Sequence, residues 1–403
     1  MLAHSPPLPL TIDYYIGDGA TAEDEEAILF ALQQHDRIRH LRLTLPVQNL
    51  QKLVMAIDEE FPILEYLIVY PPNPAEVSTV FALPETLQAP NLRLLFLRGF
   101  FYPTVRPRLH PTAAGLVTLY LGIDHPSAYF QPNILLQWIS FIPLLEDLAI
   151  FFAFPVPNRD VERLLTHTPI TTHITLSNLR SFWFRGVSAY LEAIVCRITT
   201  PRLEMLIIQL YKQLTFSVPR LVQFMDTTEN VRFDNALIIF KDKQVDALMC
   251  PREADTYSFI VSVLCWHLDW QVSSLAQISN ALSQLFSSVE HLTLRHDVHG
   301  QSSEEHDDVD LIEWRKLLRP FRNVKTLDVG KGLVEPLSRC LRSEDGELPL
   351  ELLHELQELR CTESGDAGGA FAPFIDARQN GGHHVTLTLV HAEDQAPSNP
   401  SIL

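Results

Sequence analysis

The sequence has few cysteines, and none of them lie at close spacing. The five are scattered over 403 residues without any C-x-x-C pair: Cys196, Cys250, Cys265, Cys340 and Cys361. An odd and dispersed set of this kind indicates neither a disulfide framework nor a zinc ribbon. It is typical of a protein in a reducing compartment.

Long hydrophobic runs are also missing. The first nine residues have neither the basic segment nor the apolar core of a secretory signal. No stretch of the sequence approaches the ~18 uninterrupted apolar residues that a membrane-spanning helix needs. We therefore expect no membrane segment and an intracellular location, either cytoplasmic or nuclear.

Basic residues are outnumbered by acidic ones. Lysine and arginine total 31 against 49 aspartates and glutamates, which gives a formal net charge of −18 at pH 7. A chain of this charge repels phosphate backbones and anionic lipid headgroups. We expect neither a nucleic-acid partner nor a membrane partner.

The common catalytic motifs do not occur. The sequence contains no G-x-x-x-x-G-K-[ST], no strand-linked G-x-G-x-x-G, no G-x-S-x-G and no H-E-x-x-H. Their absence argues against the usual phosphate loops, nucleophile elbows and zinc peptidases. We expect no enzyme activity, no catalytic residue and no cofactor, and an enzyme of unfamiliar type remains a remote alternative.

Two local groupings combine residue types that can carry chemistry. Cys265-Trp266-His267 places a thiol and an imidazole on one side of an extended segment but adds no third orienting group, which favours a buried cysteine. An acidic loop supplies nitrogen and oxygen donors, although its spacing fits no standard metal site and is typical of a solvated loop. The donors of that loop are His296, Asp297, His299, His306, Asp307 and Asp308. We expect no metal there.

The sequence does contain a repeat. A six-residue core of the form apolar-x-x-Leu-x-apolar, with occasional substitutions, begins at Ile38, Leu64, Leu92, Leu116, Leu145, Leu179, Leu203, Val289, Val324 and Leu356. Successive copies start 24 to 35 residues apart, except for one interval of 86 residues. That interval is about three periods long and predicts two degenerate repeats, near Phe233 and Ile260.

Each copy predicts one strand and one helix. The alternation within the core gives a strand with one buried face, and the linking segments have helical spacing, as at Leu275, Ile278, Leu282 and Leu285. One unit cannot bury its apolar strand alone, so the units must stack in parallel. We expect an array of about 12 repeats over residues 1–361, then a C-terminal cap and loose tail over 362–403. Within the cap, 371–378 is predicted helical and 385–390 extended.

These cores resemble the leucine-rich repeat, and the ~29-residue unit is similar to its longer, intracellular type. The resemblance implies an α/β fold, an irregular leucine-rich-repeat solenoid or horseshoe with parallel strands on the concave face and helices outside. In the family, the ninth position carries an Asn or Cys that bonds the turn, whereas this sequence has Pro46, Asp124 and Ser364 among others. We expect the polar backbone groups of these turns to form hydrogen bonds with other backbone groups or with water instead.

Finer features resemble fungal F-box-type leucine-rich proteins. They are a proline-rich start at residues 5–13, a closing segment at 374–379, and Pro-x-Leu at Pro62, Pro90, Pro143 and Pro201. In that family an F-box docks on a Skp1-type adaptor, and the repeats select proteins for ubiquitination. The resemblance implies a substrate receptor of an SCF-type ubiquitin ligase. Because we find no F-box motif ahead of Leu8, a Skp1-type partner is expected only if an F-box exists upstream. The alternative is a free-standing interaction scaffold.

Protein binding is expected on the strand surface. The third and fifth positions of each core point away from the buried leucines and form two columns across adjacent strands. After Arg42 and His40, the columns carry several large aromatic and apolar side chains, which favour protein binding, and the fifth-position column turns polar at Thr293, Asp328 and Arg360. The candidate protein-binding residues of the concave face are Tyr66, Phe96, Tyr120, Trp183 and Ile207. The alternative is that the register differs by one residue, or that a loop buries these side chains.

Overall fold

The computed structural model of the chain describes residues 8–15, 22–57, 59–72, 88–99, 114–154, 173–228, 233–252, 256–297, 310–342, 352–362 and 367–390. The chain divides into two compact units. Unit 1 comprises Met1–Leu206 and Gln223–Glu229, and unit 2 comprises Ile207–Val222 and Asn230–Leu403.

Unit 1 contains a parallel sheet whose strands follow the order of the chain. The sheet strands are β1 (Leu10–Tyr15), β2 (Ile38–Thr44), β3 (Tyr66–Tyr70), β4 (Leu94–Arg98), β5 (Thr118–Ile123), β6 (Asp147–Phe152) and β8 (Ser181–Gly186). The short strands β7 (Ile174–Thr175) and β9 (Ile198–Thr199) pair separately. The helices are α1 (Ala22–Leu32), α2 (Val47–Ala56), α4 (Pro132–Ile139) and α6 (Ser188–Val195), with 3-10 turns η2 (His35–Arg37) and η4 (Pro126–Ala128).

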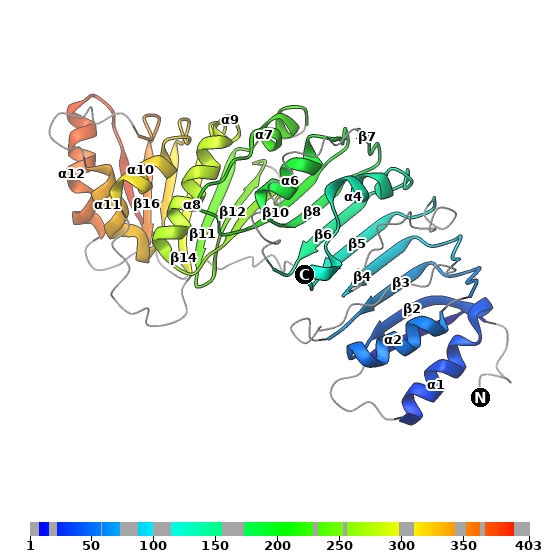
Figure 1. Cartoon of the computed structure of the whole chain (residues 1–403). Helices are drawn as coiled ribbons and strands as arrows, with labels where there is room; N and C mark the ends of the chain where they lie inside the picture. The colour runs from blue at the N-terminus through cyan, green and yellow to red at the C-terminus, as the bar shows by residue number, and fades with distance from the viewer. Residues whose placement is uncertain are drawn as a thin grey trace. The chain divides into compact units, whose positions relative to one another are not determined.

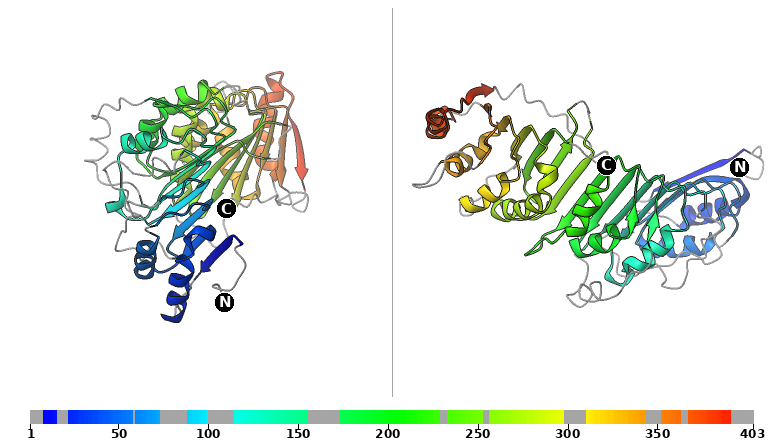
Figure 2. Two further views of the ribbon diagram at one scale, coloured as in Figure 1. Left: turned by 90° about the vertical axis from the view of Figure 1, so that its right-hand side faces the viewer. Right: turned by 90° about the horizontal axis from the view of Figure 1, so that it is seen from above.

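The helices of unit 1 lie on one face of its sheet (Figures 1 and 2). On the other face, no helix of the described ranges covers the strands. Helix α1 begins with Glu23, Asp24 and Glu25 in its first turn, where negative charge favours the positive end of the helix dipole. In both units, no helix among the described residues is long and apolar enough to cross a membrane.

Strand pairing confirms the repeat alignment that the sequence predicts. The fourth core positions are partners across neighbouring strands of unit 1, and none is more than 2% exposed: Leu41, Leu67, Leu95, Leu119, Leu148 and Phe182. The fifth positions form the adjacent row on the opposite face: Arg42, Ile68, Phe96, Tyr120, Ala149 and Trp183. The register is therefore the predicted one, without the one-residue shift that would exchange the two faces.

A tight turn precedes most of the cores, and this turn explains the Pro-x-Leu motif. The backbone N–H of the first core residue donates to the carbonyl three residues earlier, for example Leu64 to Phe61 at 3.3 Å and Leu92 to Ala89 at 3.0 Å. The prolines occupy the second position of such turns, where their fixed φ fits the backbone. The motif is therefore explained by the turn, which also forms without proline before Leu179 and Val289.

Backbone hydrogen bonds link the cores of neighbouring repeats. The carbonyl of Glu65 accepts from the N–H groups of Arg93 (2.8 Å) and Leu94 (3.0 Å), and the same pattern recurs along the array. Asparagines immediately before some cores also link repeats, although the sequence analysis did not identify them. Their side-chain amides donate to a carbonyl of the preceding repeat: Asn91 to Pro62 at 2.6 Å, Asn178 to Pro143 at 3.0 Å and Asn323 to Ser287 at 2.7 Å.

Unit 2 contains all but the first two residues of β10 (Met205–Tyr211). Its other strands are β11 (Asn235–Lys241), β12 (Gln244–Cys250), β13 (Phe259–Leu264), β14 (His291–Asp297), β15 (Thr326–Val329), β16 (Glu358–Thr362) and β17 (Thr386–Val390). Its helices are α8 (Leu268–Ala281), α9 (Ser283–Phe286), α10 (Leu311–Leu318), α11 (Val334–Leu341) and α12 (Ala367–Asn380), with the 3-10 turn η5 (Lys331–Leu333). Helix α7 (Pro219–Asp226) spans the boundary between the two residue sets. The strand order is β10-β13-β12-β11-β14-β15-β16-β17.

The middle of unit 2 differs from the prediction of two degenerate strand-and-helix repeats. Strand β12 is antiparallel to both β11 and β13, so the segment forms a three-stranded antiparallel meander. Only Asp242 and Lys243 connect β11 to β12, and two residues allow a hairpin but no helical crossover. Parallel pairing resumes at β14, which pairs with β11.

The elements predicted beyond the last core are present. Helix α12 covers the segment predicted to be helical, and β17 pairs in parallel with β16. These elements add one more strand and helix to the array. The boundary between the repeat array and the C-terminal cap, at residues 361 and 362, stays a prediction. The expected α/β arrangement of stacked strand-and-helix repeats with parallel strands is thus confirmed within each unit, apart from the meander.

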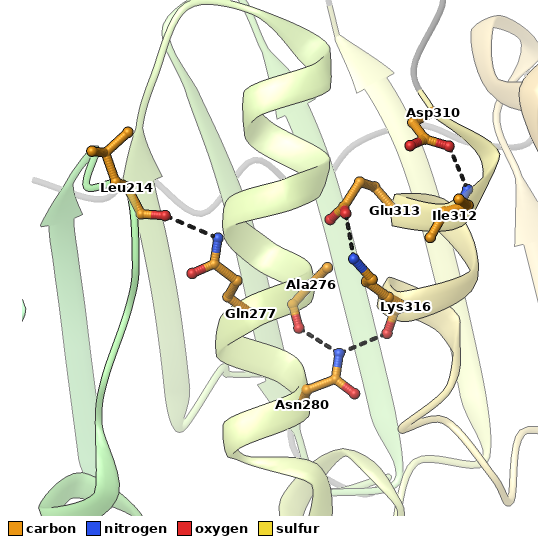
Figure 3. Close-up of polar contacts among 8 residues, drawn as sticks. All are labelled: Leu214, Ala276, Gln277, Asn280, Asp310, Ile312, Glu313 and Lys316. Atoms are coloured by element: carbon orange, nitrogen blue, oxygen red, sulfur yellow. Dashed lines mark hydrogen bonds and ion pairs between the residues drawn. The ribbon is translucent and has the colours of Figure 1, made fainter.

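Polar side chains also join neighbouring helices of unit 2 (Figure 3). The amide of Asn280 on α8 donates to the carbonyl of Ala276 (2.7 Å) and to that of Lys316 on α10 (2.8 Å). Asp310 accepts from the N–H of Ile312 at 2.9 Å and caps α10. The helix layer is therefore held by hydrogen bonds as well as by apolar packing.

Candidate functional site

The strands of unit 1 bring most of the predicted binding residues onto one surface. Phe96, Tyr120 and Trp183 are fifth-position residues of β4, β5 and β8, and all three are partly exposed. Tyr66, a third-position residue of β3, is 36% exposed. With two neighbours identified by their ring contacts, they form a surface that we call the aromatic face: Tyr66, Tyr70, Phe96, Tyr120, Phe151 and Trp183.

The rings of the aromatic face contact one another from strand to strand. Phe96 and Tyr120 are stacked with centroids 3.9 Å apart, and Tyr120 stacks on Phe151 at 4.7 Å. Tyr70 lies 5.4 Å from Phe96, and Trp183 meets Phe151 edge to face at 5.2 Å. Five rings therefore form a continuous row across β3, β4, β5, β6 and β8.

Small residues at two positions make room for this row. Ala149 stands between Tyr120 and Trp183 in the fifth-position row. Gly122 lies beside Phe151 in the seventh-position row, and a Cβ there would come within 2.6 Å of the Cγ of Arg98. The small side chain of Ala149 leaves room beside Tyr120 in its row, and the missing side chain of Gly122 lets the Arg98 stem lie over it.

The sequence analysis did not include Tyr70 and Phe151. Both are seventh-position residues, one step beyond the six-residue core that defined the repeat. Because side chains alternate along a strand, the seventh position faces the same way as the fifth. Extending the repeat pattern by one residue would have identified them.

A buried ion pair lies beside the ring stack. Nε of Arg98 donates to both oxygens of Asp124, at 3.0 and 2.9 Å. The Asp124 side chain is 2% exposed and that of Arg98 is 32% exposed. Burial raises the pKa of the Asp124 carboxyl, and the nearby guanidinium groups of Arg98 and Arg185 oppose that shift. Burial also raises the pKa of the Tyr120 phenol, so its hydroxyl remains protonated at neutral pH.

Ile207 does not belong to the aromatic face. It lies in unit 2 on β10 and is 8% exposed. Its neighbours on the same strand face, Met205 and Gln209, are more exposed, so the burial is local to Ile207. Its side chain therefore offers little surface to a partner.

The predicted change to polar side chains is present in unit 2. Thr293, Asp328 and Arg360 are partners across β14, β15 and β16. The Thr293 hydroxyl donates to Asp328 at 3.4 Å, and Arg360 pairs with Asp328 at 4.0 Å and with Glu358 at 2.8 Å. This sheet surface is ionic and contrasts with the aromatic face of unit 1.

The metal candidate is only partly described. His296 and Asp297 end strand β14. Four further donors lie outside the described residues: His299, His306, Asp307 and Asp308. Among the residues that the structure describes, no three His, Cys, Asp or Glu side chains are grouped to hold a metal ion.

Cys265 is buried, as the sequence analysis expected. It is 1% exposed, and burial raises the pKa of its thiol to about 12. The His267 ring packs edge to face on Trp270 at 4.5 Å. A thiol with this pKa is protonated at neutral pH. Because only the thiolate is nucleophilic, Cys265 is a poor nucleophile under these conditions.

We expect thiol labelling to separate the cysteines into two classes. At pH 8 the native chain should be modified by iodoacetamide at Cys196 first and at Cys250 more slowly, since both are partly exposed and burial raises the pKa of Cys250. Cys265, Cys340 and Cys361 should react only in urea, because they are buried with pKa values of about 12, 12 and 11. Peptide mass spectrometry gives each rate. Rapid native labelling of Cys265 would show an accessible, activated thiol and contradict this assignment.

Comparisons with known proteins give few relatives. No protein-family model matches the chain, and no curated protein matches it. Among solved structures, the chain is similar to the leucine-rich repeat-containing protein LegL7 from Legionella pneumophila, at 12% identity and a TM-score of 0.33, over 88% of this chain and 91% of that chain.

Proposed function

We propose that the chain is a protein-recognition module whose partner binds the aromatic face of unit 1. The observation that carries this proposal is the continuous row of partly exposed rings from Tyr70 to Trp183. Contiguous exposed apolar surface is uncommon on monomeric proteins and often marks an interaction site. Tyrosine and tryptophan are also the residues that most often dominate binding energy at interfaces.

The arrangement of the rings favours affinity. Each ring is held by its neighbours on adjacent strands, and the strands are tied by parallel pairing. Side chains that are already ordered lose little conformational entropy when a partner binds. The proposed role is recruitment alone, and it assigns no catalytic residue, metal or cofactor.

Replacing Trp183 by alanine tests the proposal. We expect Trp183→Ala to reduce the amount of partner captured from native extract about tenfold or more, the size of a hot-spot truncation. Quantitative mass spectrometry of affinity-purified full chains measures the change. The matched control is Trp266→Ala, because Trp266 is a 66% exposed tryptophan in unit 2 and lies outside the aromatic face.

Stability must be measured on the same variants. Trp183 is partly exposed, so Trp183→Ala should leave the cooperative unfolding transition in place. Equal capture by the wild-type and Trp183→Ala chains would contradict the proposal. Collapse of the fold in Trp183→Ala would show that the residue belongs to the core.

The narrower role is a substrate receptor of an F-box-type, SCF ubiquitin ligase. Its support is the sequence resemblance to fungal F-box-type proteins, including the segment 374–379. The turn geometry weakens this support, because proline is favoured at that turn position in any repeat of this kind. The capture experiment also tests this role. Recovery of a Skp1-type adaptor favours the receptor, and partners without the adaptor favour a free-standing scaffold.

A further inference from the structure

An exposed carboxylate lies beside the rings of the aromatic face. Asp147 begins β6, two residues before Ala149, so the two side chains point to the same side of the sheet. Its partners on the neighbouring strands are Thr118 on β5 and Ser181 on β8. The Thr118 hydroxyl donates to Asp147 at 3.1 Å. In the described part of the chain, Asp147 forms no ion pair, and this hydroxyl is the one side-chain donor to its carboxylate.

The rings leave Asp147 uncovered. Tyr120 and Trp183 stand on either side of Ala149 in the fifth-position row, on strands about 9.6 Å apart. Both rings contact Phe151, which lies two residues beyond Ala149 on the side away from Asp147. Ala149 itself adds only a methyl group. The surface therefore passes from the ring row to an open carboxylate within two residues of β6.

A partner that covers Trp183 must also cover Asp147. Ser181, the strand partner of Asp147, lies two residues before Trp183, which makes the carboxylate and the indole diagonal neighbours on adjacent strands. Removing a carboxylate from water is unfavourable unless a cation or several donors compensate for the lost water. Thr118 supplies one donor. A purely apolar partner would therefore leave the charge uncompensated, and an acidic partner would be repelled by it.

We infer that the partner of the aromatic face is a segment with a lysine or arginine beside apolar residues, whose cation binds Asp147 while the apolar residues cover the rings. This inference rests on the proposed function and names the partner chemistry of the same surface. The methylene stem of the basic residue can lie over Ala149, against Tyr120 and Trp183, while its charged end reaches the carboxylate. The net charge of −18 also favours the approach of a basic partner.

The nearest arginines on this face of β4 and β8 lie on the other side of the ring row. Arg98 and Arg185 are seventh-position residues, four residues along their strands from the third-position row that contains Asp147, or about 13 Å. Arg98 is also paired with Asp124, at 2.9 and 3.0 Å. Of the two sides of the ring row, the side of Asp147 is therefore the one that fits a cation.

Panning a random peptide library displayed on phage against the full-length chain tests the inference. We expect the enriched peptides to carry Lys or Arg next to apolar residues and to bind the Trp183→Ala chain poorly. Changing the basic residue to Met should weaken binding about tenfold or more, the effect of losing one hydrogen bond to a charged group. Because this change is made in the peptide, the fold of the chain is untouched.

The variant Asp147→Asn locates the cation. Asparagine keeps the shape of the side chain and still accepts from Thr118, so urea unfolding should match that of the wild type. We expect it to weaken binding of the basic peptides about tenfold in fluorescence anisotropy. It should cause no further loss for the peptides in which Met replaces the basic residue, because the two changes remove the same contact.

The matched control is Asp13→Asn, which removes the same charge from the same face of the sheet. Asp13 is 59% exposed on β1, where it is the strand partner of Arg42. Five strand spacings, about 24 Å, separate β1 from β6. The control should bind the peptides like the wild type. Equal losses in both variants would mean that the peptides respond to the overall charge of the face and would overturn the contact at Asp147.

The outcomes separate this inference from the proposed function. Peptides that depend on Trp183 but bind the Asp147→Asn chain as tightly as the wild type would uphold the aromatic face as the site and overturn the basic partner. Enrichment of acidic peptides that depend on Trp183 would overturn it too. If no enriched peptide is sensitive to Trp183→Ala, the proposed function fails and the inference fails with it.

Discussion

Replacing Phe152 by alanine is expected to lower the free energy of unfolding of unit 1 by about 3–5 kcal/mol. Phe152 is 0% exposed at the end of β6. Its ring contacts those of Tyr129, Phe130, Phe184 and Tyr190, with centroids between 4.7 and 6.4 Å away. Alanine would leave a cavity that these large rings cannot fill. A loss of this size is a large part of the typical 5–15 kcal/mol stability of a domain.

The matched control is the preceding residue. Phe151 lies on the opposite face of the same strand and is partly exposed. We expect Phe151→Ala to cost about 1 kcal/mol, since it removes ring contacts but creates no closed cavity. Urea unfolding followed by circular dichroism measures both variants. Similar large losses would mean that both faces of β6 are core, and a larger loss at Phe151 would mean that the register differs by one residue.

The second large effect concerns the ion pair of the meander in unit 2. Lys241 and Asp246 approach to 2.7 Å, and the Asp246 side chain is 2% exposed while that of Lys241 is 38% exposed. Gln244 donates to both oxygens of Asp246 at 3.0 Å. We expect Lys241→Met to lower the free energy of unfolding by about 2–3 kcal/mol, because it leaves a buried carboxylate without its cation.

A double-mutant cycle distinguishes the loss of the Lys241–Asp246 attraction from the cost of leaving the buried Asp246 charge unpaired. The variant Lys241→Met with Asp246→Leu removes both charges and should be more stable than Lys241→Met alone, since neither charge remains to be desolvated. Urea unfolding of the wild type, both single variants and the double variant gives the coupling. Additive losses would show that Asp246 is well solvated in the folded chain.

The sequence predicted the strand alignment well, because the apolar positions that recur along the chain are the positions that the fold must bury. A leucine at the fourth core position must be buried between the sheet and the helices, so copies such as Leu67 and Leu95 become register partners. The partly exposed positions of Phe96, Tyr120 and Trp183 follow from the same alternation. The aromatic face was therefore largely predictable from spacing alone.

Features that depend on contacts between distant residues were not predictable. The turn at Asp242 and Lys243 lacks the glycine or asparagine that would indicate a hairpin, so the spacing predicts repeats in this segment instead of a meander. Ile207 has the correct core position, but its own side chain is buried in the folded chain. The Arg98 stem occupies the space that a side chain at Gly122 would need, a combination visible only when the strands are aligned.

Site-specific photo-crosslinking most directly tests whether the aromatic face binds a protein. Benzoylphenylalanine placed at Tyr66, which is 36% exposed on this face, is compared with the same group at Phe30, which is 47% exposed on α1 in the helix layer of unit 1. The account predicts a protein adduct from position 66 that disappears in the Trp183→Ala background, and no adduct from position 30. An adduct from position 30 with none from position 66 would contradict it.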